Sequence, residues 1–253
     1  MVLEVRDLHT AYGLSRVLFG VSLEVGAGEC VCLLGRNGVG KTTTMRSIMG
    51  LTPPSAGRIV WKGTDITGWP AYRVARAGIG FVPEDRRIFA DLTVWENLDV
   101  ASRARRSDAG PPAPDSGHPR SAPASRPPIQ WSIERVLELF PQLGGLVRRN
   151  GGYLSGGEQQ MLTIARTLMG NPELLLLDEP SEGLAPLVVE HLREQVARLK
   201  REGLTILLAE QNVGFSLELA DRVYVLEKGA IRFSGPAARL REDEALRHEL
   251  LAL

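Results

Sequence analysis

The stretch that decides the fold is GECVCLLGRNGVGKTTTMRSIMG, residues 28–50. An apolar run typical of a buried strand leads into the glycine-rich loop GRNGVGKT (35–42), and a stretch with helical character follows. The loop matches the pattern G-x-x-x-x-G-K-[ST], in which glycines let backbone N–H groups surround phosphate oxygens and the next helix adds positive charge at its N-terminus. A chance match is the alternative in a chain with 27 glycines. The order strand, loop, helix argues against chance and predicts a phosphate-binding loop.

Each polar group of this loop has an expected partner. Lys41 can reach the β- and γ-phosphates of a nucleotide, and the Thr42 hydroxyl can ligate Mg²⁺. The residues predicted to bind ATP are Gly35, Arg36, Asn37, Gly38, Val39, Gly40, Lys41, Thr42 and Thr43.

A second motif is LLLLDEP, residues 174–180. Four leucines predict a strand buried on both faces, and an acidic pair at its end is costly unless it meets a cation. Asp178 is predicted to hold Mg²⁺ through water, and Glu179 to polarise the water that attacks the γ-phosphate. The alternative is a strand that simply surfaces into a polar turn.

A third strand, in TILLAEQN (205–212), also ends in polar residues. Ligands of parallel sheets collect at the carboxyl ends of the strands. We therefore expect the phosphate loop, the Asp178–Glu179 pair and Gln211 to converge at one edge, around the γ-phosphate.

The segment YLSGGEQQ (153–160) predicts a helix start, since Ser155 and Glu158 have the spacing of a capping box. Gly156 and Gly157 leave the first N–H groups of that helix uncovered, which makes a second anion-binding terminus. Either this chain binds two phosphate groups, or this terminus serves a partner's nucleotide. An ordinary well-capped helix is the alternative.

The remaining pattern indicates an α/β protein. The first 60 or so residues alternate as strands do, which predicts an antiparallel sheet, and the strands from residue 28 onward alternate with helices, which predicts a parallel one. A helix is expected over 186–203, with Pro186 at its start and Gly203 at its end. Residues 101–130 are rich in Pro, Ala and Arg and are expected to form a disordered insertion. Contact of its arginines with lipid headgroups or RNA is the less favoured alternative.

Composition excludes several classes of protein. Lys plus Arg equals Asp plus Glu at 30 each, so no overall field favours nucleic acid, and none is expected as a partner. The N-terminus shows no secretory signal, and no apolar run is long enough to span a membrane. The two cysteines, Cys30 and Cys32, are expected to be reduced core residues.

Together, GRNGVGKT, LSGGEQQ and LLLLDEP resemble the nucleotide-binding subunit of an ATP-binding cassette (ABC) transporter, over nearly the whole chain outside 101–130. The resemblance implies a P-loop NTPase (RecA-like) core with an N-terminal antiparallel β subdomain, together spanning 1–92 and 158–253, and a helical subdomain over 93–157. It also implies that two cassettes enclose two ATP molecules. Tyr12 would stack on adenine, the alternative being a surface aromatic in a turn. The residues that would contact the partner's ATP are Ser155, Gly156, Gly157 and Glu158.

Three departures from the general family pattern resemble one branch, the ATPase subunits of branched-chain or hydrophobic amino-acid uptake systems. Glu84 stands where most cassettes have glutamine, Ala185 where the loop after the catalytic glutamate ends in aspartate, and Gln211 where a histidine is usual. Glu84 is a weak candidate ligand of Mg²⁺. Gln211 can orient the γ-phosphate or the water but cannot take a proton, so Glu179 must act as the base alone.

The resemblance implies an ATP-hydrolysing importer subunit on the cytoplasmic face of the inner membrane, closing as a pair on ATP and reopening after hydrolysis. Its expected partners are a second ABC subunit, in a heterodimer or a homodimer, two membrane-spanning permeases and, indirectly, a solute-binding protein. Uptake of urea or short amides is the near alternative. An ABC protein of translation or DNA repair is the distant one.

Overall fold

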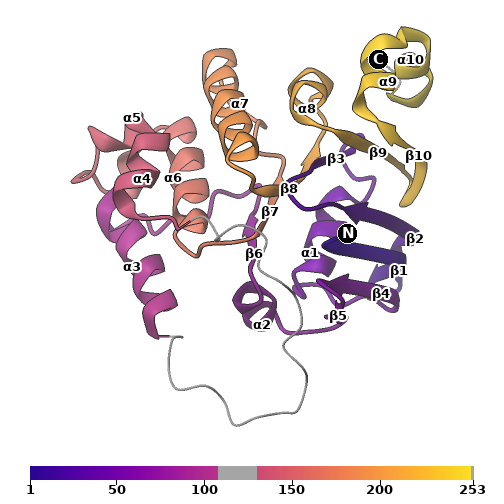
Figure 1. Cartoon of the computed structure of the whole chain (residues 1–253), viewed down its shortest axis with the longest axis horizontal. Helices are drawn as coiled ribbons and strands as arrows, with labels where there is room; N and C mark the ends of the chain where they lie inside the picture. Colours follow the sequence, from indigo (N-terminus) through magenta and orange to yellow (C-terminus); the bar gives the residue numbers. More distant parts are fainter. Residues whose placement is uncertain (108–129, 252–253) are drawn as a thin grey trace. The chain divides into compact units, whose positions relative to one another are not determined.

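The computed structural model describes residues 1–107 and 130–251. They form two compact units, Met1–Arg86 with Pro172–Leu253 and Arg87–Asn171 (Figure 1). The first unit contains two sheets and the second is helical. We describe each unit by itself.

The first unit begins with a four-stranded antiparallel sheet in the order β2-β1-β4-β5. Strands β1 and β2 pair with Leu3 opposite Val25, and alternate residues such as Leu3 and Val5 are buried. The predicted antiparallel sheet is therefore confirmed. Its strands are β1 (Leu3–Tyr12), β2 (Ser15–Val25), β4 (Ala56–Trp61) and β5 (Thr64–Asp65).

The second sheet has six strands in the order β10-β9-β3-β8-β7-β6, parallel except for the edge strand β10. Every residue of β3, β7 and β8 is buried, as expected for strands covered on both faces. Cys30 and Cys32 are buried free thiols of β3. The strands are β3 (Cys30–Leu34), β6 (Ile79–Val82), β7 (Leu174–Asp178), β8 (Thr205–Glu210), β9 (Arg222–Glu227) and β10 (Ala230–Pro236).

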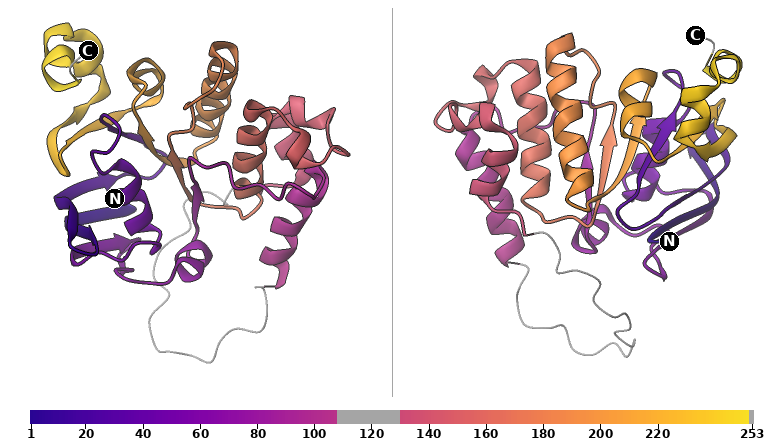
Figure 2. Two further views of the ribbon diagram at one scale, coloured as in Figure 1. Left: turned by 180° about the vertical axis from the view of Figure 1, so that it is seen from behind. Right: turned by 45° about the horizontal axis from the view of Figure 1, so that its top comes forward.

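Helices cover both faces of this parallel sheet. Helix α1 (Lys41–Ile48) buries Met45 and Ile48 in the same core as the antiparallel sheet, whereas α7 (Pro186–Arg201) and α8 (Val213–Leu219) lie on the other face (Figure 2). Helix α7 begins at Pro186 as predicted, and Gly203 follows its end at a φ of 93°. The other helices of the unit are α2 (Ala71–Arg76), α9 (Ala237–Glu242) and α10 (Glu244–Leu251).

The second unit is built around α6 (Gly156–Leu168), which packs against the three other α-helices of the unit. Ser155 and Glu158 form the predicted capping box at its start. The other elements are α3 (Val94–Ser107), α4 (Ile133–Leu139), α5 (Pro141–Gly144) and the 3₁₀ turn η1 (Gly151–Tyr153).

Two sequence-based boundaries differ from the structure. The helical unit spans 87–171 and not 93–157, because α6 packs on α3, α4 and α5 and therefore belongs with them. Helix α3 continues to Ser107, so the prediction of a loop from residue 101 is wrong for its first seven residues. Alanine and arginine favour helix, and an ion pair of Asp99 with Arg103 at 2.7 Å spans one turn. The rest of the predicted insertion, 108–129, lies outside the described residues.

Candidate functional site

The phosphate loop joins the end of β3 to the start of α1, as its motif requires. Gly38 and Gly40 have φ values of 80° and 112°, which side-chain-bearing residues rarely adopt. A Cβ on Gly35 would lie 2.5 Å from the Leu226 carbonyl oxygen, and one on Gly40 would lie 2.7 Å from the Leu18 side chain. These glycines are thus needed both for the turn and for its close packing.

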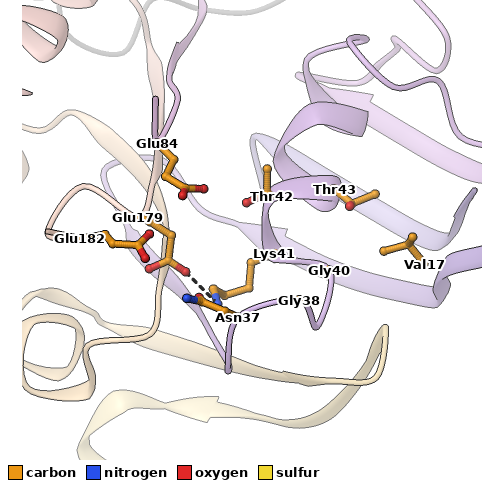
Figure 3. Close-up of a pocket in the computed structure, with 10 residues that line it drawn as sticks. All are labelled: Val17, Asn37, Gly38, Gly40, Lys41, Thr42, Thr43, Glu84, Glu179 and Glu182. Atoms are coloured by element: carbon orange, nitrogen blue, oxygen red, sulfur yellow. Dashed lines mark ion pairs between the residues drawn. The ribbon is translucent and has the colours of Figure 1, made fainter. Parts of the chain in front are cut away.

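The Lys41 side chain is buried and folds back over its own loop. Its ammonium donates hydrogen bonds to the carbonyl oxygens of Gly35, at 2.6 Å, and Arg36, at 2.9 Å. It also forms an ion pair with Glu179 Oε1 at 2.8 Å, drawn as a dashed line in Figure 3. The positive charge therefore lies between the loop and the end of β7, where a phosphate oxygen would bind.

The Thr42 hydroxyl donates a hydrogen bond to Asp178 Oδ1 at 3.0 Å. Burial raises the pKa of Asp178 to about 7, and the negative charges of Glu179 and Glu84 add to this rise. Burial and the neighbouring Glu182 also raise the pKa of Glu84. A bound cation would offset the repulsion between these carboxyl groups and stabilise their charged forms.

These oxygen donors suit Mg²⁺, which prefers hard oxygen ligands. Within the described parts of the chain, no three acidic, His or Cys side chains gather closely enough to hold a metal by themselves. The hydroxyl of Thr42 and the carboxylate of Asp178 would therefore leave most positions to water and phosphate oxygens. Magnesium is usually bound to proteins with nucleotides in this way.

Glu179 directly follows β7 in a left-handed conformation, at a φ of 47°. Its backbone N–H donates to the Ala209 carbonyl at 2.9 Å, and its Oε2 accepts from the backbone N–H of Gln211 at 3.1 Å. The ends of β7 and β8 thus hold the carboxylate next to Lys41. This arrangement suits a group that acts on a water beside a phosphate.

A cavity of about 260 Å³ lies at this edge of the sheet. In Figure 3 the carboxyl groups of Glu84, Glu179 and Glu182 lie on one side of it, and Thr42 and Lys41 on the other. Its lining residues are Val17, Asn37, Gly38, Gly40, Lys41, Thr42, Thr43, Glu84, Glu179 and Glu182.

Two of these lining residues were not predicted from the sequence. Glu182 belongs to the loop after DEP, where its acidic side chain was a usable signal. Val17 lies on β2 and carries no motif that could have pointed to it. The predicted residues Gly35, Arg36 and Val39 lie in the loop but do not line the cavity, and neither does Asp178.

A family model described as ABC transporter matches residues 18–182. The chain belongs to the ABC transporter family. It is 40% identical to the high-affinity branched-chain amino acid transport ATP-binding protein BraG of Pseudomonas aeruginosa, with 96% of each chain covered. It is 34% identical to the lipopolysaccharide export system ATP-binding protein LptB of Haemophilus influenzae, covering 99% of this chain and 97% of LptB.

Solved structures agree with this family. The ADP conformation of an ATP-binding cassette of an ABC transporter is similar with a TM-score of 0.76 and 27% identity, over 96% of each chain. The protein is thus an ATP-binding ABC ATPase of a transporter, with the P-loop NTPase core expected from the sequence. Within residues 1–107 and 130–251, no helix has the length and apolar character needed to cross a membrane.

In this ABC ATPase, Tyr12 ends β1 with about half of its side chain exposed. Its hydroxyl contacts Thr52 Oγ1 at 3.4 Å. Partial burial raises the pKa of Tyr12, but hydrogen bonds with Thr52 and Thr43 outweigh this, and its net pKa is lowered. Thr43 also lines the cavity, so the Tyr12 hydroxyl lies near a residue of the site, and stacking of the ring on adenine stays a prediction.

Gln211 lies close to Glu179 through its backbone only. Its side chain is exposed and is not among those that line the cavity. The predicted convergence at the sheet edge is therefore present for the phosphate loop, Asp178 and Glu179, and only the main chain of Gln211 takes part. Ala185, the third departure, is the residue before α7.

The signature segment lies in the helical unit. Ser155 Oγ accepts from the Glu158 N–H at 3.4 Å, and Glu158 Oε2 accepts from the Ser155 N–H at 2.7 Å. Gly156 and Gly157 begin α6 behind this cap. The contact of these residues with a partner's nucleotide stays a prediction.

Proposed function

We propose that this ABC ATPase energises the uptake of branched-chain or other hydrophobic amino acids. The observation that carries the proposal is the 40% identity to BraG along 96% of both chains. Glu84, Ala185 and Gln211 support it, because the same three departures are usual in this branch. The solute itself would be selected by other subunits.

The site geometry supports a division of labour in hydrolysis. Lys41 would exchange Glu179 for the β- and γ-phosphates of ATP, and Glu179, once released, would accept a proton from the attacking water. Gln211 would orient the γ-phosphate or the water after turning its side chain inward. Thr42 and Asp178 would hold Mg²⁺, with Glu84 as a weaker candidate. When bound, the ion neutralises charge on the phosphate oxygens.

The cycle requires partners. A second ABC subunit, in a heterodimer or a homodimer, would bring its signature residues to the ATP bound here, while Ser155, Gly156, Gly157 and Glu158 serve the partner's ATP. ATP favours the closed pair and hydrolysis resets it. Two permeases at the inner membrane and, indirectly, a solute-binding protein would complete the importer, with this chain on the cytoplasmic face.

Lipopolysaccharide export is a second candidate, because the chain is 34% identical to LptB along nearly its whole length. Uptake of urea or short amides remains the near alternative within import. A cassette of translation or DNA repair is the distant one.

Uptake assays on a strain that lacks the gene distinguish these candidates. Loss of leucine, isoleucine and valine uptake, restored by the wild-type gene and not by Glu179→Gln, is the expected result. Unchanged amino-acid uptake, combined with loss of urea uptake or of surface lipopolysaccharide, would contradict the proposal. Co-purification of the chain with ribosomes and not with permeases would contradict every proposed transport role.

A further inference from the structure

Glu210, the last residue of β8, is a buried acid that has no part in the proposed mechanism. Only 1% of the residue is exposed, and it does not line the cavity. Its Oε1 accepts a hydrogen bond from the Ser181 N–H at 2.9 Å, and its Oε2 accepts from the N–H groups of Gln211 and Asn212, each at 3.1 Å. One carboxylate is therefore divided between two loops.

The same residue also contacts the phosphate loop. Its carbonyl oxygen accepts from the Gly35 N–H at 3.4 Å. The Gln211 N–H is shared, since Glu179 Oε2 accepts from it at 3.1 Å. Glu210 thus joins the first residue of the phosphate loop, the loop after Glu179 and the segment after β8. The place where Glu210 holds Gln211 determines where Glu179 finds its own hydrogen-bond donor.

The energetics favour a bridging role over a packing role. A buried carboxylate is costly, and burial raises the pKa of Glu210 above its ordinary value. Leu207, Leu208 and Ala209 precede it in β8, and an apolar side chain at position 210 would avoid the desolvation cost of a buried carboxylate. Three backbone N–H groups donate hydrogen bonds to the carboxylate and offset the cost of burying its charge, because hydrogen bonds to an ionised acceptor are stronger than those to a neutral one. An amide or an apolar side chain could not accept all three.

The backbone of Glu179 adds an independent reason. Its left-handed conformation persists only where the surroundings hold it in place. The Ala209 carbonyl holds the Glu179 N–H, and Glu210 holds the N–H two residues later, at Ser181. The end of β8 therefore fixes the turn that presents the catalytic glutamate.

We propose that Glu210 is a positioning residue for ATP hydrolysis, which ties the Ser181 loop to the Gln211–Asn212 backbone and so keeps Glu179 aligned. The proposal rests on the proposed role of Glu179 as the base and is independent of the transported solute. Nucleotide binding by Lys41 and the phosphate loop does not require the side-chain bridge.

The test is Glu210→Gln, which preserves shape and removes one acceptor. Its NH₂ group must face one of the N–H donors, so one half of the bridge is lost. We expect kcat for ATP hydrolysis to fall about 10- to 100-fold with KM for ATP within about two-fold, because alignment is lost and binding is kept. Glu210→Asp keeps the charge and should recover part of kcat.

Glu29→Gln is the matched control. Glu29 accepts from the Gly26 N–H at 2.7 Å and pairs with Arg222 at 2.8 Å, at the opposite end of the parallel strands. Its kcat should stay within about two-fold of the wild type, since that end of β3 is away from the phosphate loop. Equal losses in both variants would overturn the proposal.

Further outcomes separate positioning from general damage. A wild-type kcat in Glu210→Gln, or a rise in KM in proportion to the fall in kcat together with a lowered Tm, would also overturn the proposal. If Glu210→Gln does not fold, Glu210→Asp is measured alone: its side chain is one methylene too short to keep both halves of the bridge, so a partly reduced kcat with KM kept is expected, and a kcat equal to the wild type would overturn the proposal. Failure of the proposed catalytic role is recognised differently, as full turnover in Glu179→Gln.

Discussion

The Lys41 ammonium and the Glu179 carboxylate form a buried ion pair at 2.8 Å, with 4% and 5% of the two side chains exposed. The lysine is the group expected to contact the phosphates, and the glutamate is the group expected to activate water. While they are paired, neither side chain is free for its expected role. Entry of the γ-phosphate would give Lys41 a new partner and release Glu179 for catalysis in the same step.

Replacing Glu179 with Gln should separate binding from turnover. Turnover should fall at least about 100-fold, because removal of a general base typically costs 10²–10⁴ in rate. ATP affinity should be kept or increased, since the amide competes less strongly for Lys41. Hydrolysis rates and the affinity for a fluorescent ATP analogue measure the two effects. Full turnover in this variant would show that Glu179 is not the base.

Replacing Lys41 with Ala should weaken both nucleotide binding and folding. The Glu179 carboxylate would stay buried without its cation, which costs about 3 kcal/mol of the free energy of unfolding. Denaturant unfolding without nucleotide measures this, and adding Glu179→Gln to Lys41→Ala should restore part of it. Lys62→Ala is the control, because its pair with Glu173 is about half exposed and is worth at most about 1 kcal/mol. Unchanged ATP affinity in Lys41→Ala would mean that the loop is not the site.

Much of this site was predictable because its chemistry is local in sequence. The phosphate loop needs glycine at Gly38 and Gly40 for backbone reasons, and the Asp178–Glu179 pair stands out after four leucines. The convergence of the strand ends follows from parallel topology, which the strand and helix alternation already indicated. Each of these features can be recognised from a short, continuous stretch of sequence.

The rest depends on contacts between distant residues. The Lys41–Glu179 pair and the hydrogen bond from the Ser181 N–H to Glu210 each join segments separated by more than twenty residues, and no periodicity reveals them. The end of α3 was missed for another reason. Arg103 and Ala104 favour helix locally, but the proline-rich composition that follows dominated the prediction.

Tyr12 offers a test of base stacking that separates the ring from the hydroxyl. Tyr12→Phe should leave ATP affinity within about two-fold, because the 3.4 Å contact with Thr52 is at the long limit of a hydrogen bond. Tyr12→Ala should lower the affinity about 10-fold, since stacking on a base is worth about 1–3 kcal/mol. Titration with a fluorescent ATP analogue gives both values. Equal affinities for the alanine variant and the wild type would assign Tyr12 to an ordinary surface turn.

The two thiols should be unreactive in the folded protein. Burial raises the pKa of Cys30 to about 12 and the pKa of Cys32 well above its usual value, so the thiolate is scarce at neutral pH. A raised pKa contributes stability that is complete below pH 9 and is lost as the pH rises towards about 12. Mass spectrometry after iodoacetamide treatment at pH 8 should find neither cysteine modified until denaturant is added. Modification without denaturant would show that β3 opens in the native state.

Gln211 separates orientation from proton transfer at the end of β8. The wild-type residue cannot take a proton, so the pH dependence of kcat should contain no ionisation from this position. Gln211→Ala should reduce kcat about 10-fold, as expected when a water or phosphate loses an orienting group. Gln211→His should introduce a new ionisation near pH 6.5, the ordinary pKa of histidine, if the side chain turns into the cavity during turnover. Steady-state rates between pH 5.5 and pH 9 test this, with Asn212→Gln as the control for the neighbouring exposed amide. Superimposable profiles for the wild type, Gln211→Ala and Gln211→His would mean that the exposed side chain stays outside the site, and would leave Glu179 and its backbone partners to orient the water.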